Sequence, residues 1–363
     1  MLHFFRERFP SEKLNFNALV TEKQVPMHKM TWGYYTGGLV LFFLFVQVVT
    51  GLLLLLYYQA TVSDAFVSVK AIMENVQGGA LIRNMHTWSS SLMIFCALVH
   101  LLTTFSMKSF EKPREITWLA GILLLFITFA FGFTGYLLPW NQLSVNATKV
   151  LLQSIDQVGA YLPSPLTELP KLARQLLQGG EIIGQATLSR FFALHVVVLP
   201  AMLLFVLGIH LLSVQIHGMS QGVDKQSNRA DRREKFFPIS LSRDLILWAI
   251  AFLVLYLLAL CIPFDALISF PLLAPYNPFG ATPVGIKPEW YFYFIYYPLE
   301  LLPFGVVVLC FAIVSALLFL TPWIFSRTSR RVLSAIALTA ATYLFVITVF
   351  GQQIYNALRG GQS

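Results

Sequence analysis

The sequence has few charged residues. They make up 12% of its 363 residues, against about a quarter in soluble globular proteins. Hydrophobic residues make up 57%. This balance excludes an ordinary soluble domain and indicates a protein whose solvent is largely lipid.

Cysteine is also scarce. The three cysteines, Cys96, Cys261 and Cys310, lie within or at the end of apolar blocks. None belongs to a C-x-x-C-H motif, so neither covalent haem attachment of the c type nor a disulfide framework is expected. The first 33 residues are mixed and charged and lack the pattern of a cleavable signal peptide. We expect this segment to lie along a membrane surface.

Seven apolar blocks are long enough to cross a bilayer, which requires about 20 residues. They span about 34–58, 84–106, 116–138, 191–215, 244–263, 299–323 and 332–355. The predicted fold is an all-α integral membrane protein with seven transmembrane helices. We expect a four-helix bundle in residues 1–217, a cytoplasmic linker in 218–243 and a three-helix region in 244–363.

The net charge of +8 follows the loops rather than forming one basic patch. Most Lys and Arg residues fall on the side of the N-terminus, in that segment and in every second loop. Positive residues favour the cytoplasmic side. We therefore predict a multi-pass protein of the bacterial cytoplasmic (inner) membrane, with a cytoplasmic N-terminus, lipid contacts and no nucleic-acid partner.

Four histidines lie inside predicted spans. His86 and His100 are 14 residues apart in the second span, and His195 and His210 are 15 residues apart in the fourth. On a regular helix these intervals return to within roughly 40° and 60° of the same face, about 21 Å further along. Both spans run in the same direction, so His86 should meet His195 near the outer surface. His100 should then meet His210 near the inner surface.

Two histidine pairs at two depths are typical of haem binding. Bis-imidazole ligation leaves no open position on a haem iron and suits electron transfer. Zinc or copper would need further Cys, Asp or Glu ligands at the same depths. For any single intramembrane histidine, a hydrogen-bonded interior residue is an equally good interpretation. The four together predict two non-covalent b-type haems within the four-helix bundle, with His86, His195, His100 and His210 as iron ligands.

Glycines on the first and third spans repeat the histidine interval. Gly37 and Gly51 are 14 residues apart, as are Gly121 and Gly135. Glycine permits close approach, and we expect a flat macrocycle to be what approaches. The alternative is ordinary small-residue helix packing.

Two arginines are candidates for binding haem propionates. Arg83 lies one turn before His86, and Arg114 lies at the inner end of the third span. Either residue would equally serve as a topology anchor.

Several motifs resemble the cytochrome b family, and the likeness covers nearly the whole chain. They are Arg83-Asn-Met-His86-Thr-Trp88, Lys112-Pro-Arg-Glu-Ile-Thr-Trp118, Gly135-Tyr-Leu-Leu-Pro-Trp140, Gly184-Gln-Ala-Thr-Leu-Ser-Arg190 and Pro288-Glu289-Trp290-Tyr291. The resemblance implies a subunit of a proton-translocating quinol:cytochrome c (or plastocyanin) oxidoreductase. Such a subunit works in a homodimeric complex with a Rieske iron–sulfur protein and a c-type cytochrome. Quinol is oxidised on the outer side. One electron goes to the Rieske centre, and the other crosses two haems to quinone on the cytoplasmic side.

The 15-residue interval and the seven spans resemble the chloroplast-type and Gram-positive branch of this family. In that branch a cysteine near the start of the first span tethers an additional haem, and an arginine serves it. Here Tyr35 and Gln215 stand at those positions. No covalent third haem is expected.

Glu289 is the candidate proton acceptor from quinol. A carboxylate in an apolar loop at membrane level should have a raised pKa, which would poise it to accept a proton near neutral pH. The alternative is a surface ion pair with Lys287.

Tyr291 is the second candidate catalytic residue. With Pro288 and Trp290 it would shape the quinol pocket, and Tyr136 would line the same pocket. Interfacial aromatic residues are nevertheless common in membrane proteins.

On the cytoplasmic side, His217 and Asp224 are candidate proton donors to quinone, although each would equally be a solvated loop residue. Two other classes of protein remain open at this point. One is the di-haem membrane anchor of another quinone-linked oxidoreductase. The other is a haem-free transporter with histidine proton relays.

Overall fold

The computed structural model describes residues 24–26, 32–220, 233–262, 274–280 and 286–359. Within these residues, seven helical segments are long and apolar enough to cross a membrane. The prediction of an all-α protein with seven spans is therefore confirmed. Most of the N-terminal segment predicted to lie along the membrane, and Asp224, fall outside the described residues.

The first four spans are α3 (Trp32–Leu55), α5 (Gly79–Ser106), α6 (Glu115–Leu137) and a composite helix, Gln185–His217. The composite helix joins α9 (Gln185–Ala193), a π turn (Leu194–Val198) and α10 (Leu199–His217). It begins six residues before the predicted span. The added turns carry polar residues and extend beyond the apolar block from which the span was predicted.

The last three spans are Phe236–Cys261, α13 (Phe304–Ile324) and α14 (Arg330–Arg359). The first of these comprises a π turn (Phe236–Ser240) and α11 (Leu241–Cys261). It begins inside the segment predicted as a linker. The mostly apolar residues Phe236–Ser240 precede α11 and are joined to it across a kink, since the backbone of Phe237 is not helical.

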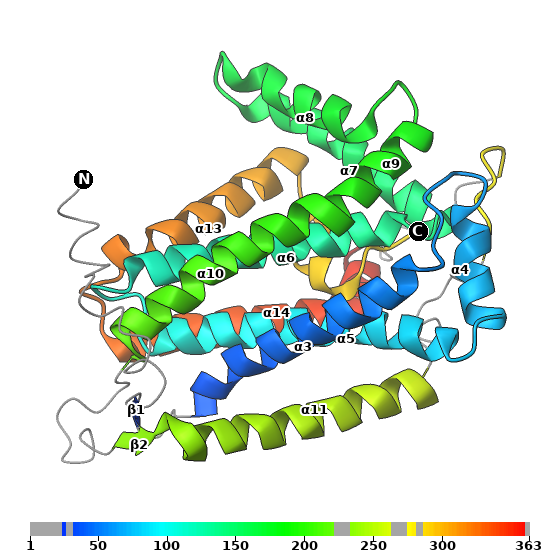
Figure 1. The fold of residues 1–363 in the computed structure, drawn as a ribbon. Helices are drawn as coiled ribbons and strands as arrows, with labels where there is room; N and C mark the ends of the chain where they lie inside the picture. Colours follow the sequence, from blue (N-terminus) through cyan, green and yellow to red (C-terminus); the bar gives the residue numbers. More distant parts are fainter. Residues whose placement is uncertain (1–23, 27–31, 221–232, 263–273, 281–285, 360–363) are drawn as a thin grey trace.

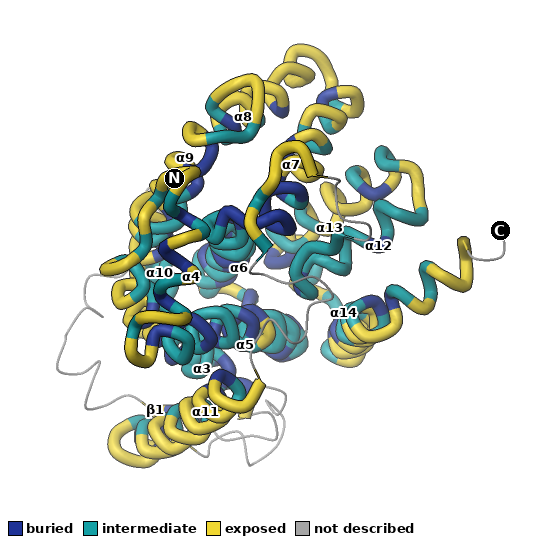
Figure 2. Tube along the Cα trace, turned by 90° about the vertical axis from the view of Figure 1, so that its right-hand side faces the viewer, coloured by how far each residue is buried: buried dark blue, intermediate teal, exposed yellow. Residues whose placement is uncertain are grey.

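Helices α3 and α5 pack along one another, as do α6 and α10 (Figure 1). Helix α11 covers α5 and α3, α13 lies on α6, and α14 lies on α5. Figure 2 shows that α11 is largely exposed on its outer side, whereas α3 and α5 carry buried residues where they face other helices. The exposed surface is apolar, as expected where a helix borders lipid.

Short helices gather at one end of the bundle, which the distribution of Lys and Arg residues predicts to face outward; this end is called the outer end below, and the opposite end the inner end. They are α4 (Ala65–Glu74), α7 (Gln142–Val158), the 3-10 turns Gly159–Tyr161 and Leu166–Glu168, α8 (Leu169–Gln178), the 3-10 turn Trp290–Phe292 and α12 (Tyr293–Leu301). Helix α7 begins with a capping box, in which Asn141 Oδ1 accepts from the Ser144 backbone N–H at 2.8 Å. An ion pair of 2.7 Å between Arg174 and Asp156 joins α8 to α7.

The opposite end carries the described strands, β1 (Gln24–Pro26) and β2 (Arg233–Lys235), which pair antiparallel with Val25 opposite Glu234. This small sheet was not predicted. Its strands are three residues long and far apart in the sequence, so they leave no periodic pattern.

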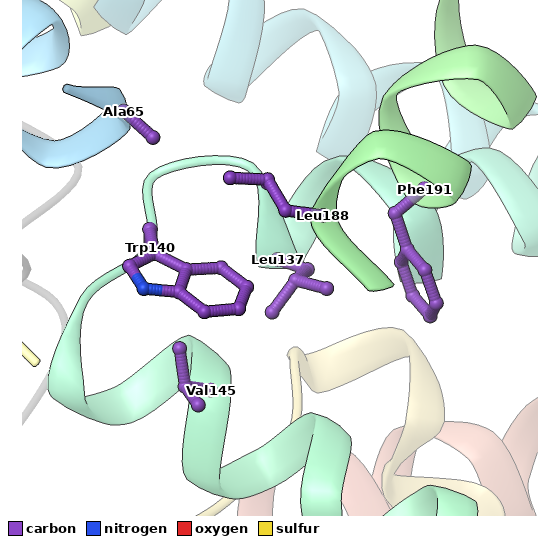
Figure 3. Close-up of a cluster of buried hydrophobic side chains, with 6 residues drawn as sticks. All are labelled: Ala65, Leu137, Trp140, Val145, Leu188 and Phe191. Carbon is purple, nitrogen blue, oxygen red and sulfur yellow. The ribbon is translucent and has the colours of Figure 1, made fainter. Parts of the chain in front are cut away.

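A buried cluster fixes the outer end of α6 relative to α9 (Figure 3). Its members come from α4, α6, the turn after α6, α7 and α9, and they are Ala65, Leu137, Trp140, Val145, Leu188 and Phe191. Because Leu137 follows Gly135 and Tyr136 directly, this packing also fixes the position of these two candidate site residues on α6.

Candidate functional site

The four intramembrane histidines lie in two pairs. His86 of α5 and His195 of the π turn are close enough to interact electrostatically, and so are His100 of α5 and His210 of α10. All four side chains are half-buried. In each pair, one histidine comes from α5 and the other from the composite helix Gln185–His217, so each pair links these two spans of the bundle.

Each imidazole packs against a glycine of the neighbouring helix. A β-carbon built on these glycines would lie 2.7–3.3 Å from the imidazole Cε1 of the facing histidine. The pairs are Gly37 with His100, Gly51 with His86, Gly121 with His210 and Gly135 with His195. In the structure, the imidazole ring directly occupies the space over each glycine. This packing explains why the glycines and the histidines share one interval.

The Nδ1 atom of every one of these histidines faces an oxygen of the adjacent helix. The contacts are His86 with Thr50 Oγ1 (2.9 Å), His100 with Thr36 Oγ1 (3.0 Å), His195 with Thr134 Oγ1 (3.1 Å) and His210 with the Thr117 carbonyl (2.9 Å). Sequence reasoning missed the threonines, although three of the four glycines directly follow a threonine. In the described part of the chain, Nε2 of these histidines has no hydrogen-bond partner.

The π turn accounts for the unequal histidine intervals. Residues Leu194–Val198 form the turn, and the Leu199 N–H bonds to the Leu194 carbonyl, five residues back. A π turn takes up one extra residue, so 15 residues here advance the helix face about as far as 14 residues of a regular helix. His195 and His210 are thereby brought into register with His86 and His100.

This arrangement fits two haems. Paired imidazoles with Nδ1 engaged and Nε2 without a protein partner are the donor set that a six-coordinate haem iron requires. Apolar side chains of α6 and α10, among them Ile127, Leu203 and Val206, pack around the same bundle.

A second polar group lies at the outer end of α6. Tyr291 is buried against Gly132, whose added β-carbon would meet the phenol oxygen at 2.7 Å. Glu289 lies close enough to interact electrostatically with Tyr136 and Tyr291. Burial raises the pKa of the Glu289 carboxyl to about 7. In the part of the chain that the structure describes, Glu289 has no ion pair with Lys287 or any other cation.

Aromatic rings close this outer group. The Trp290 ring meets Tyr291 edge-on, with centroids 5.6 Å apart, and Phe129 of α6 packs on Phe292 at 5.9 Å. Pro288 lies in the extended segment just before the 3-10 turn. Burial, the Glu289 carboxylate and Tyr136 raise the pKa of the Tyr291 phenol well above its ordinary value. The phenol therefore stays protonated at neutral pH.

The two candidate propionate ligands lie at opposite ends of the bundle. Arg83 is buried near the start of α5, with Nη1 3.0 Å from Met73 Sδ of α4. Arg114 donates to the carbonyls of Gly218 and Met219, both at 3.3 Å. It therefore closes the inner end of α10 with two of its five N–H groups.

The inner end also contains an acidic residue that the sequence analysis did not single out. Asp244 of α11 lies against α3, where a β-carbon on Gly38 would be 2.9 Å from Oδ1. Gly38 follows Gly37, which packs on His100. Tyr35, one turn earlier on α3, hydrogen-bonds to Arg243. His217 is half-buried at the last turn of α10.

The fold and the paired histidines define a multi-pass, all-helical membrane protein with the donor arrangement of a membrane cytochrome. The family model for cytochrome b/b6/petB matches residues 20–218, and the model for the C-terminal part of cytochrome b/b6/petD matches residues 275–359. The chain belongs to the cytochrome b/b6 family.

Two relatives illustrate the range of this similarity. The cytochrome b subunit of a cytochrome bc complex from Chlorobaculum thiosulfatiphilum is 42% identical over 300 residues, which are 80% of this chain and 64% of that relative. Cytochrome b6 from Synechococcus elongatus is 37% identical over 212 residues, which are 58% of this chain and 94% of that protein. The chain thus spans somewhat less than two thirds of the first relative and nearly all of the second.

A solved structure described as a hyperthermophilic respiratory Complex III shares the fold. It superposes with a TM-score of 0.74 and 23% identity, and the match covers 98% of this chain and 97% of the other. The likeness therefore includes α11 and its surroundings, which lie between the segments matched by the two family models.

Proposed function

We propose that this chain is the cytochrome b subunit of a cytochrome bc complex, with quinol:cytochrome c oxidoreductase activity. It would oxidise quinol at the outer side and reduce quinone at the cytoplasmic side, coupled to proton translocation. The observation that carries the proposal is the two histidine pairs, each ring seated on a glycine, at two depths of one bundle.

His86 and His195 would hold the outer haem and His100 and His210 the inner one, through Nε2. When bound, the haems supply one-electron transfer across the apolar layer. Gly37, Gly51, Gly121 and Gly135 seat the imidazole rings. Arg83 and Arg114 would bind propionates at the outer and inner sites. Because Tyr35 replaces the tethering cysteine of related proteins, we propose no covalent third haem.

At the outer side, Glu289 would accept a proton from quinol. Its pKa of about 7 allows it to be unprotonated when quinol binds and protonated afterwards. Tyr291 would hold the headgroup with its protonated phenol. Tyr136, Pro288 and Trp290 would shape the pocket and exclude water.

At the cytoplasmic side, protons for quinone would come through His217 and Asp244. Asp244 is the better supported of the two, because its carboxylate packs against Gly38 of α3, and the preceding residue, Gly37, packs against His100. Asp224 remains a proposal from sequence alone.

The partners we propose are a Rieske iron–sulfur protein, a c-type cytochrome and a second copy of the complex. The membrane would be the bacterial cytoplasmic membrane, with a cytoplasmic N-terminus. The di-haem unit would comprise residues 1–217 and the quinol-site region residues 244–363, with residues 218–243 between them.

A redox-difference spectrum of the purified complex tests this function, together with acid–acetone extraction and the mass of the chain. We expect two extractable b haems per chain and an unmodified polypeptide. His86→Ala and His100→Ala should each remove a different haem. A covalently attached haem would contradict the interpretation of Tyr35. The absence of haem would exclude electron transfer and favour a transporter.

A further inference from the structure

Three threonine hydroxyls beside the histidines share one hydrogen-bonding arrangement. Each donates its proton to a carbonyl of the preceding turn of its own helix and turns its oxygen toward Nδ1 of a histidine on the neighbouring helix. The acceptors are the Gly33 carbonyl for Thr36 (2.6 Å), the Val46 carbonyl for Thr50 (2.7 Å) and the Ala130 carbonyl for Thr134 (2.8 Å).

This arrangement favours one of the two positions for the imidazole ring proton. A hydroxyl has one proton, and here that proton is already directed to a helix carbonyl. With the proton on that carbonyl, the oxygen accepts from the imidazole, which places the ring proton on Nδ1 and leaves the lone pair on Nε2. Consecutive hydrogen bonds of this kind polarise one another, and an acceptor at Nδ1–H raises the basicity of a metal-binding imidazole.

The fourth histidine is served differently. Thr36, Thr50 and Thr134 each precede a ring-seating glycine, but the residue before Gly121 is Ala120. His210 Nδ1 instead lies 2.9 Å from the Thr117 main-chain carbonyl. The outer pair is thus held by two hydroxyls together with the Phe131 main chain at His195, and the inner pair by one hydroxyl and one carbonyl.

We propose that Thr36, Thr50 and Thr134 are positioning residues that hold His100, His86 and His195 in the Nε2-binding tautomer and set how strongly each ring donates to its iron. Thr50 and Thr134 would act on the outer haem only, and Thr36 on the inner haem only. This inference rests on the proposed function, because it takes haem iron to be the partner of Nε2.

The alternative is that these residues are ordinary buried threonines bonded to their own helix. Thr128 of α6 is such a residue, since its hydroxyl donates to the Leu124 carbonyl at 2.8 Å and contacts no histidine in the described chain. It provides a matched control on one of the same helices.

The test is a potentiometric titration of both haems in the assembled complex, with ferric low-spin EPR of the same samples. Thr→Val removes the hydroxyl at nearly constant volume. Losing the acceptor makes the imidazole a weaker donor and favours ferrous iron. At a fixed ambient potential, T50V and T134V should each raise the reduced-to-oxidised ratio of the outer haem about 3- to 10-fold, where tenfold corresponds to 59 mV for one electron. T36V should do the same for the inner haem alone.

Thr→Ser variants should retain wild-type potentials and g-values, and T128V should change neither haem. Unchanged potentials in all three Val variants at full haem content would overturn the proposal, as would an equal shift in T128V. If a Val variant loses haem, its Ser variant decides. Retention of haem and potential in the Ser variant supports the hydroxyl role. Loss of haem in the Ser variant as well would show that the site depends on side-chain packing at this position, and would overturn the proposal. Absence of two haems in the wild-type complex would instead contradict the proposed function.

Discussion

Gly135 of α6 lies so close to His195 that a β-carbon on the glycine would come within 2.7 Å of the imidazole Cε1. The corresponding distance from Gly51 to His86 is 3.3 Å, which a small shift would relieve. The outer histidine pair is therefore seated asymmetrically, with the tighter contact between α6 and the π turn.

Gly135→Ala should remove most of the outer haem, because the ring must move away from its ligating position. Gly51→Ala should retain more of it. The measurement is haem per chain, with the outer and inner haems distinguished in difference spectra. Gly208→Ala on α10 is the control, since its β-carbon would meet nothing within 4 Å in the described chain. Full haem content in the Gly135 variant would contradict the steric argument.

The π turn should tolerate a deletion better than an insertion. Removing Val197, which is 62% exposed, would shorten the interval between His195 and His210 to that of α5 and leave a regular helix in register. Adding one alanine after Val197 would rotate His195 by about 100°. We expect the deletion to keep both haems and the insertion to lose at least one. Equal losses in purified complexes would show that the turn does not correct the register.

Quinol oxidation should depend on pH through Glu289. Burial raises its pKa from 4.5 to about 7, so the carboxylate that can accept a proton forms as pH rises through about 7. Tyr136, Tyr291 and Tyr293 face it. The phenols of Tyr291 and Tyr293, which lie outside the spans, remain protonated over that range. The rate of quinol-driven haem reduction should therefore rise over about one pH unit on either side of 7.

Glu289→Gln should slow that reduction by about 10²-fold or more and abolish this pH dependence. Glu300→Gln is the control, because it removes a carboxylate from the adjoining α12 and leaves Glu289 in place. A wild-type pH profile in the Glu289 variant would show that another group accepts the proton. The raised pKa has a second consequence: the protonated carboxyl stabilises the folded chain below pH 4.5, and this stabilisation is lost as pH rises through about 7.

Orientation is testable by labelling single cysteines in intact cells after replacement of Cys96, Cys261 and Cys310. A cysteine at Lys171 of α8 should react with a membrane-impermeant maleimide, because α8 lies at the outer end of the bundle. A cysteine at Ser329, between α13 and α14, should react only after the cells are opened. The reverse pattern would invert the proposed topology.

The spans and the four histidines were accessible from sequence because both follow from local rules. Lipid demands long apolar helices with internally satisfied backbones, and the helical repeat places residues 14 apart on nearly one face. The glycine repeat was visible for the same reason. Asp244 was missed because an isolated carboxylate at a helix start carries no periodic signal, and only the packing of α11 on α3 brings it to Gly38.

The sequence by itself determined that this chain crosses a membrane seven times and carries four imidazoles at two depths. Tertiary structure decided what each of those side chains touches. The contacts of Thr36, Thr50 and Thr134 with the histidines, and of Tyr291 with Gly132, join residues 36–159 positions apart. The physical reason is that helix formation depends on neighbours within a few residues, whereas hydrogen bonds and ring contacts between helices depend on the axial offset and rotation of each pair.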